Sequence, residues 1–157
     1  MSDALNQALE QFHRLREAGL SAIISGKKKG LKVVGTYCTY CPQELILAAG
    51  AVPISLCGTK EEPIAAAEET LPRNLCPMIK SSYGFAVTDT CPFFFFSDLI
   101  IGETTCDGKK KMFEIMQQKK PVHVMTLPHT QTGADAVQFW VAEMRRLRTR
   151  LEQELAV

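Results

Sequence analysis

Hydrophobic residues follow two different patterns along the chain. From Ala4 to Leu20 they recur every three or four positions, which predicts an amphipathic helix that Gly26 and Gly30 end. Beyond this helix, short apolar runs alternate with helical patterns. The runs predict strands at 31–35, 52–56, 98–101 and 121–125, and the patterns predict helices at 42–49, 63–69, 77–86, 108–119 and 132–155.

The alternation of strands and helices predicts an α/β fold. We expect a short, mostly parallel sheet of about four strands with helices on both faces. Pro53 has no backbone N–H, so its strand should begin there or lie at a sheet edge. Ligands of such sheets bind beyond the carboxyl ends of the strands. Four residues follow predicted strands and should meet at that edge: Cys38, Cys57, Cys106 and His129.

Composition narrows the class of protein. With 157 residues, of which 46% are apolar and 22% charged, the chain fits one soluble globular domain. Its net charge of +1 favours neither nucleic acid nor a membrane surface as a partner. The N-terminus lacks the apolar core of a signal peptide, and the longest apolar run, Phe93–Phe96, is too short to span a bilayer. We therefore expect a cytoplasmic protein. Residues 27–29 and 109–111 are lysine clusters, either solvated helix ends or contacts for an anionic ligand.

Six cysteines lie within one stretch of the chain: Cys38, Cys41, Cys57, Cys76, Cys91 and Cys106. Structural disulfides are not expected in a reducing cytoplasm. Thiolates are the preferred ligands of iron–sulfur clusters, which makes such a cluster the sharper hypothesis. The alternative is six small buried apolar side chains.

The six cysteines are not equivalent. Cys38 and Cys41 form a C-x-x-C pair, which suits a redox disulfide, zinc or an iron–sulfur cluster; no second pair exists for a zinc ribbon. Cys76 and Cys106 precede predicted helices, and helix N-termini stabilise thiolates. Cys91, before an aromatic run, is expected to pack, whereas the role of Cys57 stays open.

Two glutamates and two histidines are further candidates for a functional site. Glu44 lies in the first turn of a predicted helix, as N-terminal helix charge or as a base or ligand beside a cluster. The same two roles are open to Glu103. His123, inside a predicted strand, should be a satisfied buried imidazole. His129 is the histidine expected near a site.

Several longer strings resemble the 2-hydroxyacyl-CoA dehydratase family, which includes 2-hydroxyglutaryl-CoA dehydratase and benzoyl-CoA reductase subunits. The similarity is greatest to its stand-alone members, such as the double-cubane cluster proteins, and runs from about residue 33 to 128. The strings are Gly35-Thr36-Tyr37-Cys38, Pro42-Gln43-Glu44, Arg73-Asn74-Leu75-Cys76-Pro77, Ile79-Lys80-Ser81-Ser82-Tyr83-Gly84, Gly102-Glu103-Thr104-Thr105-Cys106-Asp107-Gly108-Lys109-Lys110-Lys111 and Pro121-Val122-His123-Val124-Met125-Thr126-Leu127-Pro128.

The resemblance implies a Rossmann-like three-layer domain with an iron–sulfur cofactor, either [4Fe–4S] or a double cubane. On this basis residues 1–30 form an N-terminal helix and residues 31–157 the cluster-binding N-terminal domain, with the family's C-terminal domain absent. Cys76 and Cys106 match the ligand motifs best. Cys38 is a third candidate ligand, Cys41 a weaker one, and Glu44 the catalytic candidate.

The resemblance also implies an activity. The family's dehydratases remove water from a (R)-2-hydroxyacyl-CoA through a ketyl radical, started by one electron from a separate ATP-hydrolysing iron–sulfur activator. The expected partners are that activator, the acyl-CoA substrate, and a second copy or second family subunit. The alternatives are a double-cubane reductase of small molecules and an inactive fragment whose α/β domain only binds a partner.

Overall fold

The computed structural model describes residues 3–156, in two compact parts that divide between Leu31 and Lys32. The first part is essentially one helix, α1 (Asp3–Lys27), as the spacing of its apolar residues predicts. The chain leaves α1 through Gly30, whose φ of 86° suits a glycine, and Leu31 N donates a hydrogen bond to Gly26 O. Along residues 3–156, no helix has both the length and the apolar character needed to span a membrane.

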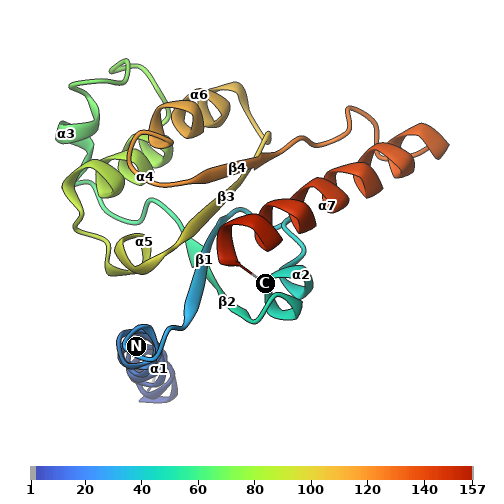
Figure 1. Ribbon diagram of the computed structural model, residues 1–157. Coiled ribbons are helices and arrows are strands. Elements are labelled where there is room, and N and C mark those ends of the chain that lie inside the picture. Colours follow the sequence, from blue (N-terminus) through green and yellow to red (C-terminus); the bar gives the residue numbers. More distant parts are fainter. Residues whose placement is uncertain (1–2, 157) are drawn as a thin grey trace. The chain divides into compact units, whose positions relative to one another are not determined.

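The second part is built on one sheet of four parallel strands (Figure 1). The strands lie in the order β2-β1-β3-β4, and their bounds are β1 (Lys32–Tyr37), β2 (Ala51–Leu56), β3 (Leu99–Glu103) and β4 (Val122–Met125). The predicted α/β class and strand number are confirmed. The predicted edge position of the strand that contains Pro53 is also confirmed, because β2 pairs with β1 alone.

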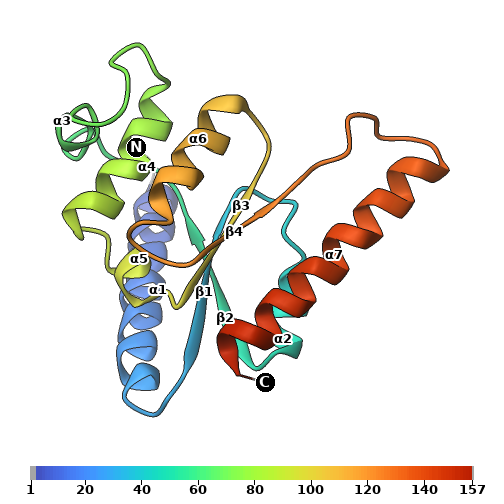
Figure 2. The ribbon, with the colours of Figure 1, turned by 45° about the horizontal axis from the view of Figure 1, so that its top comes forward.

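Helices cover both faces of the sheet and give three layers (Figures 1 and 2). One face carries α3 (Ile64–Ala67), α4 (Pro77–Thr88), α5 (Pro92–Phe96) and α6 (Asp107–Met116), and the other carries α2 (Gln43–Ala48) and α7 (Ala134–Leu155). Two details differ from the sequence prediction. Pro42 precedes α2 as its N-cap instead of opening it, and the aromatic run begins with a short helix that Pro92 starts.

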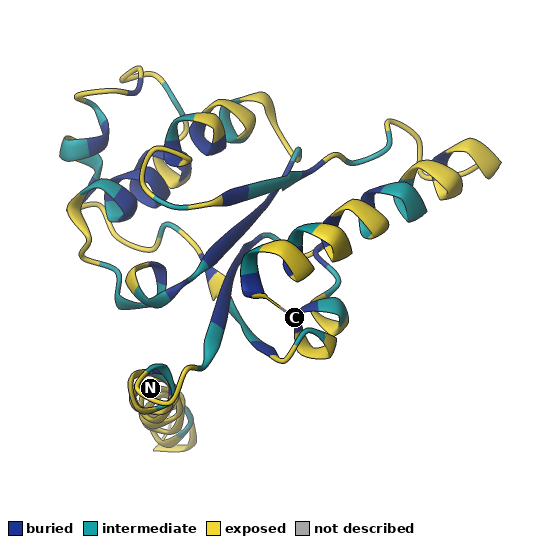
Figure 3. Ribbon diagram, viewed as in Figure 1, coloured by how far each residue is buried: buried dark blue, intermediate teal, exposed yellow. Residues whose placement is uncertain are grey.

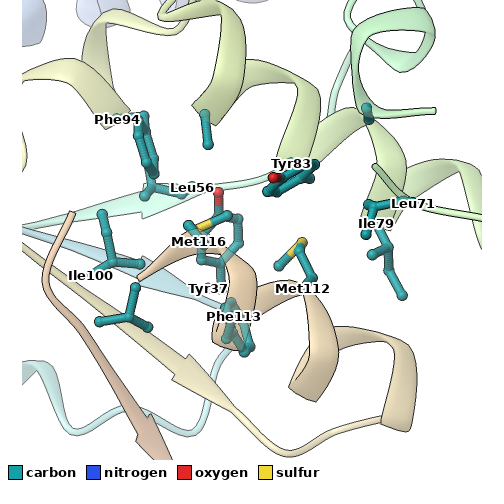
Figure 4. Close-up of a cluster of buried hydrophobic side chains, with 13 residues drawn as sticks. Tyr37, Leu56, Leu71, Ile79, Tyr83, Phe94, Ile100, Met112, Phe113 and Met116 are labelled. Carbon is teal, nitrogen blue, oxygen red and sulfur yellow. The ribbon is translucent and has the colours of Figure 1, made fainter. Parts of the chain in front are cut away.

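A separate hydrophobic core fills each side of the sheet, so the central strands β1 and β3 are buried on both faces (Figure 3). In the first core, helix α6 presses Phe113 against Tyr37, with 5.5 Å between the ring centroids (Figure 4). In the second, Leu147 and Leu151 of α7 pack over β1 and β3. Both cores hold the strand ends, and hence the loops that follow them, in place.

The strand order places a topological switch point between β1 and β3. From β1 the chain moves outward to β2, and from β3 it moves outward to β4 in the opposite direction. The loops after β1 and β3 therefore diverge from the centre of the sheet, which is where ligands of open parallel sheets bind.

Candidate functional site

Cys38 follows β1 directly and meets the segment that follows β3. Its Sγ lies 3.8 Å from Thr105 Oγ1. Lys109, in the first turn of α6, donates a hydrogen bond from Nζ to the same sulfur atom. The thiol thus lies where the segments after β1 and β3 meet, beside the ammonium group of Lys109.

The backbone of the turn after β1 is held in an unusual conformation. Cys38 has φ 69°, in the left-handed region, which costs about 1–2 kcal/mol for a residue other than glycine. Three residues further, Cys41 N donates a hydrogen bond of 2.6 Å to Glu103 Oε1. Because Glu103 ends β3 and is completely buried, its carboxylate anchors this turn to the centre of the sheet.

Glu103 is itself an unusual group. Burial raises the pKa of its carboxyl, while the backbone N–H groups of Cys41 and Tyr40 and the charge of Lys109 oppose that shift. Its second oxygen, Oε2, is buried without a hydrogen-bond partner among residues 3–156. A buried carboxylate retained at a strand end, with one oxygen unpaired, is typical of a functional site.

Cys76 and Cys106 are the N-cap residues of α4 and α6, and both are exposed. Neither side chain makes a capping hydrogen bond. The two helix starts are neighbours, because a Cβ on Gly108 would lie 2.8 Å from Ile79 Cδ1 and 3.0 Å from Leu75 Cδ1. The two thiols therefore lie at adjacent helix N-termini and make no capping hydrogen bond with any residue that the structure describes.

The donor set suits an anionic cluster held by thiolates. The helix N-termini that carry Cys76 and Cys106, and the Lys109 ammonium beside Cys38, supply positive potential around these thiols. Sulfur donors in such surroundings are the ligands that iron–sulfur clusters take. Within the described part of the chain, no three His, Cys, Asp or Glu side chains are close enough to hold a single metal ion.

Cys41 differs from Cys38, although the two belong to one C-x-x-C pair. Its side chain is buried in the second core. Burial first, then the charges of Glu103 and Glu44, raise the pKa of the Cys41 thiol to about 12. Glu44 itself is exposed in the first turn of α2. The structure thus separates a half-buried thiol paired with Lys109 from a buried one surrounded by carboxylates.

This difference predicts selective alkylation. Iodoacetamide at pH 8 should modify exposed Cys57, Cys76 and Cys106 within minutes, and leave Cys41 unmodified in the native protein, because a buried thiol of high pKa offers no accessible thiolate. Mass spectrometry of the peptides measures this. In denaturant all six cysteines should react. Native-state modification of Cys41 as fast as that of Cys106 would contradict the assignment.

The remaining candidates lie elsewhere or act structurally. His129 is exposed in the loop after β4, whose Leu127 N donates a hydrogen bond of 2.9 Å to Thr104 Oγ1. Cys57 is exposed after β2, and Cys91 packs against the first core, which confirms its predicted role. The prediction for His123 was wrong: its Nε2 is buried without a hydrogen-bond partner among the described residues.

Two features of the site go beyond the sequence prediction. Lys109 belonged to a lysine cluster with two open roles, and its contact with Cys38 becomes visible only when β1 and β3 are adjacent. The sequence leaves the same two roles open to Glu103 and to Glu44. Its distinguishing signal is position, since it is the last residue of a strand that is buried on both faces.

Comparison with known proteins identifies the same family that the sequence strings resemble. Residues 38–157 match the family described as "2-hydroxyglutaryl-CoA dehydratase, D-component". The chain is 55% identical, over 92% of its length, to YjiM of Escherichia coli (strain K12), provisionally named a dehydratase subunit. It is 25% identical over 96% of its length to the beta subunit of (R)-2-hydroxyglutaryl-CoA dehydratase from Acidaminococcus fermentans.

A third relative is the beta subunit of lactoyl-CoA dehydratase from Anaerotignum propionicum, 28% identical over 82% of this chain. The matched regions cover 38%, 40% and 33% of the three relatives. The chain therefore spans about one third to two fifths of the length of these three relatives.

Proposed function

Since the chain belongs to the 2-hydroxyglutaryl-CoA dehydratase D-component family, we propose that it is the N-terminal, iron–sulfur-binding domain of a 2-hydroxyacyl-CoA dehydratase-type hydro-lyase. The observation that supports the proposal is the adjacency of the helix starts that carry Cys76 and Cys106, with Cys38 in contact with Thr105, the residue before Cys106. The thiolates of these residues would hold the cluster. When bound, the cluster supplies a Lewis-acidic iron and a route for one electron.

The chain's own residues prepare this edge. Lys109 donates a hydrogen bond to the Cys38 sulfur, and Glu103 fixes the turn that presents it. The starts of α4 and α6 direct positive potential toward the bound group. Glu44, exposed in α2, is the chain's candidate for moving a proton on the substrate.

The proposed partners follow from the same family. The substrate is a (R)-2-hydroxyacyl-CoA, and the electron comes from an ATP-hydrolysing iron–sulfur activator in the cytoplasm. Two of the relatives are named as beta subunits. We therefore propose that a second family subunit, or a second copy of this chain, completes the assembly.

Reconstitution with iron and sulfide under anaerobic conditions tests the proposal. Wild type should retain iron and sulfide, and Cys38→Ala, Cys76→Ala and Cys106→Ala should each lose at least half of both, because each removes a thiolate ligand. Cys57→Ala is the matched control, since Cys57 is exposed at a strand end but is not a proposed ligand. Iron and sulfide are counted per chain, and the absorbance near 400 nm is recorded.

Two outcomes would count against the proposal. One is equal iron retention in all four variants. The other is no iron in the wild-type chain, both alone and when it is co-expressed with a second family subunit.

A double-cubane reductase of small molecules is the second candidate. The observation that favours it is Cys38, a third thiol at the edge and a ligand position of that branch. Such a protein would reduce a small molecule without any acyl-CoA. Turnover of a 2-hydroxyacyl-CoA by the assembled enzyme would favour the dehydratase.

A further inference from the structure

A second polar feature lies away from the cysteine edge, between β4 and α7. An open cavity of about 400 Å³ is found there. All of its lining side chains can donate a hydrogen bond, and none is acidic or apolar: His123, Arg145, Arg146, Thr149, Arg150 and Gln153. We call it the arginine cavity.

The positive charge of the arginine cavity is only partly neutralised. Arg146 pairs with Glu143, and Arg150 Nη2 lies 2.8 Å from Glu154 Oε1. Arg145 takes part in none of the ion pairs identified among residues 3–156. Three guanidinium groups are thus matched by two carboxylates, neither of which lines the cavity.

Two buried nitrogen atoms of the lining also lack partners. His123 Nε2 and Arg150 Nε are shielded from solvent without a hydrogen bond to any of the described residues. Buried polar groups are normally paired, so these two nitrogen atoms mark an incompletely satisfied polar wall beside the cavity.

We propose that the arginine cavity binds a phosphate-class anion. The planar fork of arginine matches the geometry of phosphate oxygens, and an imidazole and a hydroxyl add further donors. His123 is the second residue of β4, whereas the cysteine edge lies beyond the carboxyl ends of the strands, so the two sites are distinct. Two sources share this chemistry: free inorganic phosphates, and the phosphates of coenzyme A. The second source rests on the proposed function.

Calorimetric titration of the 157-residue chain in low-salt buffer, with inorganic pyrophosphate and then with coenzyme A, tests the proposal. Arg145→Gln should weaken binding about tenfold, because a charge-assisted hydrogen bond is lost from an exposed residue that the fold does not need. Arg148→Gln is the matched control. Arg148 lies on the same helix and is also exposed, but it pairs with Glu152 at 3.4 Å and does not line the cavity. Its replacement should change binding less than twofold.

NMR of the histidine side chains supplies a second readout, since pyrophosphate should shift the His123 resonances and leave those of His13 unchanged. Coenzyme A that binds and displaces pyrophosphate supports the cavity with the coenzyme as source, and binding of pyrophosphate alone supports it with free phosphate. Equal weakening by both arginine variants would overturn the proposal. An unmoved His123 signal, or no saturable binding of either probe, would overturn it as well.

Discussion

Replacement of Gly84 by alanine is expected to lower the free energy of unfolding by about 3 kcal/mol and the melting temperature by about 10 °C. A Cβ on Gly84 would lie 2.0 Å from the backbone oxygen of Pro63 and 2.6 Å from its carbonyl carbon. A backbone carbonyl cannot rotate aside, so α4 or the segment before α3 must move. Helix propensity alone would make the alanine variant more stable by about 1 kcal/mol. A loss of stability would therefore have to come from the contact with Pro63. Urea unfolding followed by circular dichroism measures it.

Gly108→Ala is the matched control for this substitution. Gly108 also lies in a helix, and its added Cβ would also make close contacts, but these are with the ends of Ile79 and Leu75. Flexible side-chain ends can yield, so we expect a change below about 1 kcal/mol. Equal destabilisation by the two substitutions would contradict this account of the contact between α4 and Pro63.

Loss of the Glu103 carboxylate should have the second large effect. Glu103→Ala removes the acceptor of Cys41 N–H and leaves space in the core, and should lower the free energy of unfolding by about 2–4 kcal/mol. Glu103→Gln keeps an acceptor oxygen of the same shape. It should be much less harmful, and its effect should depend on pH.

The sign of that pH dependence follows from linkage. Burial raises the pKa of Glu103 in the folded state above its value in the unfolded chain. The folded state therefore holds the proton to higher pH, and the stability it gains is present at low pH and lost as pH rises through the folded-state pKa. The Gln variant has no such loss. Its stability relative to wild type should thus increase as pH rises upward from about 4.3.

Urea unfolding of both proteins between pH 4.5 and pH 8 measures this difference. Glu114→Gln is the control, because Glu114 is an exposed glutamate of α6 whose side chain is 65% accessible. Its difference from wild type should stay flat. A flat difference for Glu103→Gln as well would show that the Glu103 carboxyl titrates alike in the folded and unfolded chain.

Much of the fold follows from local patterns. Runs such as Leu31–Gly35 and Leu99–Ile101 are too short and too apolar for surface helices, and proline and glycine separate them from the helical stretches. The position of Cys76 and Cys106 before helices was predictable for the same reason, since Pro77 and Asp107 favour helix starts. The helix at Pro92–Phe96 was not, because four consecutive phenylalanines carry no periodicity.

The parts of the site that escaped prediction depend on strand order. Local sequence cannot say that β1 lies beside β3, and only that pairing brings Lys109 to Cys38 and Glu103 to Cys41. The unpaired His123 nitrogen was missed for a related reason. Alternation along a strand gives the face on which a side chain lies, but α7, packed on that face, decides whether it finds a partner.

The strand order also fixes when the cysteine edge can form during synthesis. β1 and β2 can pair early, since partners such as Val34 and Pro53 are close in sequence. The contacts of Cys38 with Thr105 and Lys109, by contrast, join residues that are 67 and 71 positions apart in the sequence. The hydrogen bond between Cys41 and Glu103 spans 62 positions. At ribosomal rates of about 5–20 residues per second, Cys38 emerges about 4–14 s before Lys109. Through that interval the Cys38 thiol lacks its neighbouring cation, although β2 can already pair with β1. The cysteine edge is therefore completed in the finished fold and not in the growing chain.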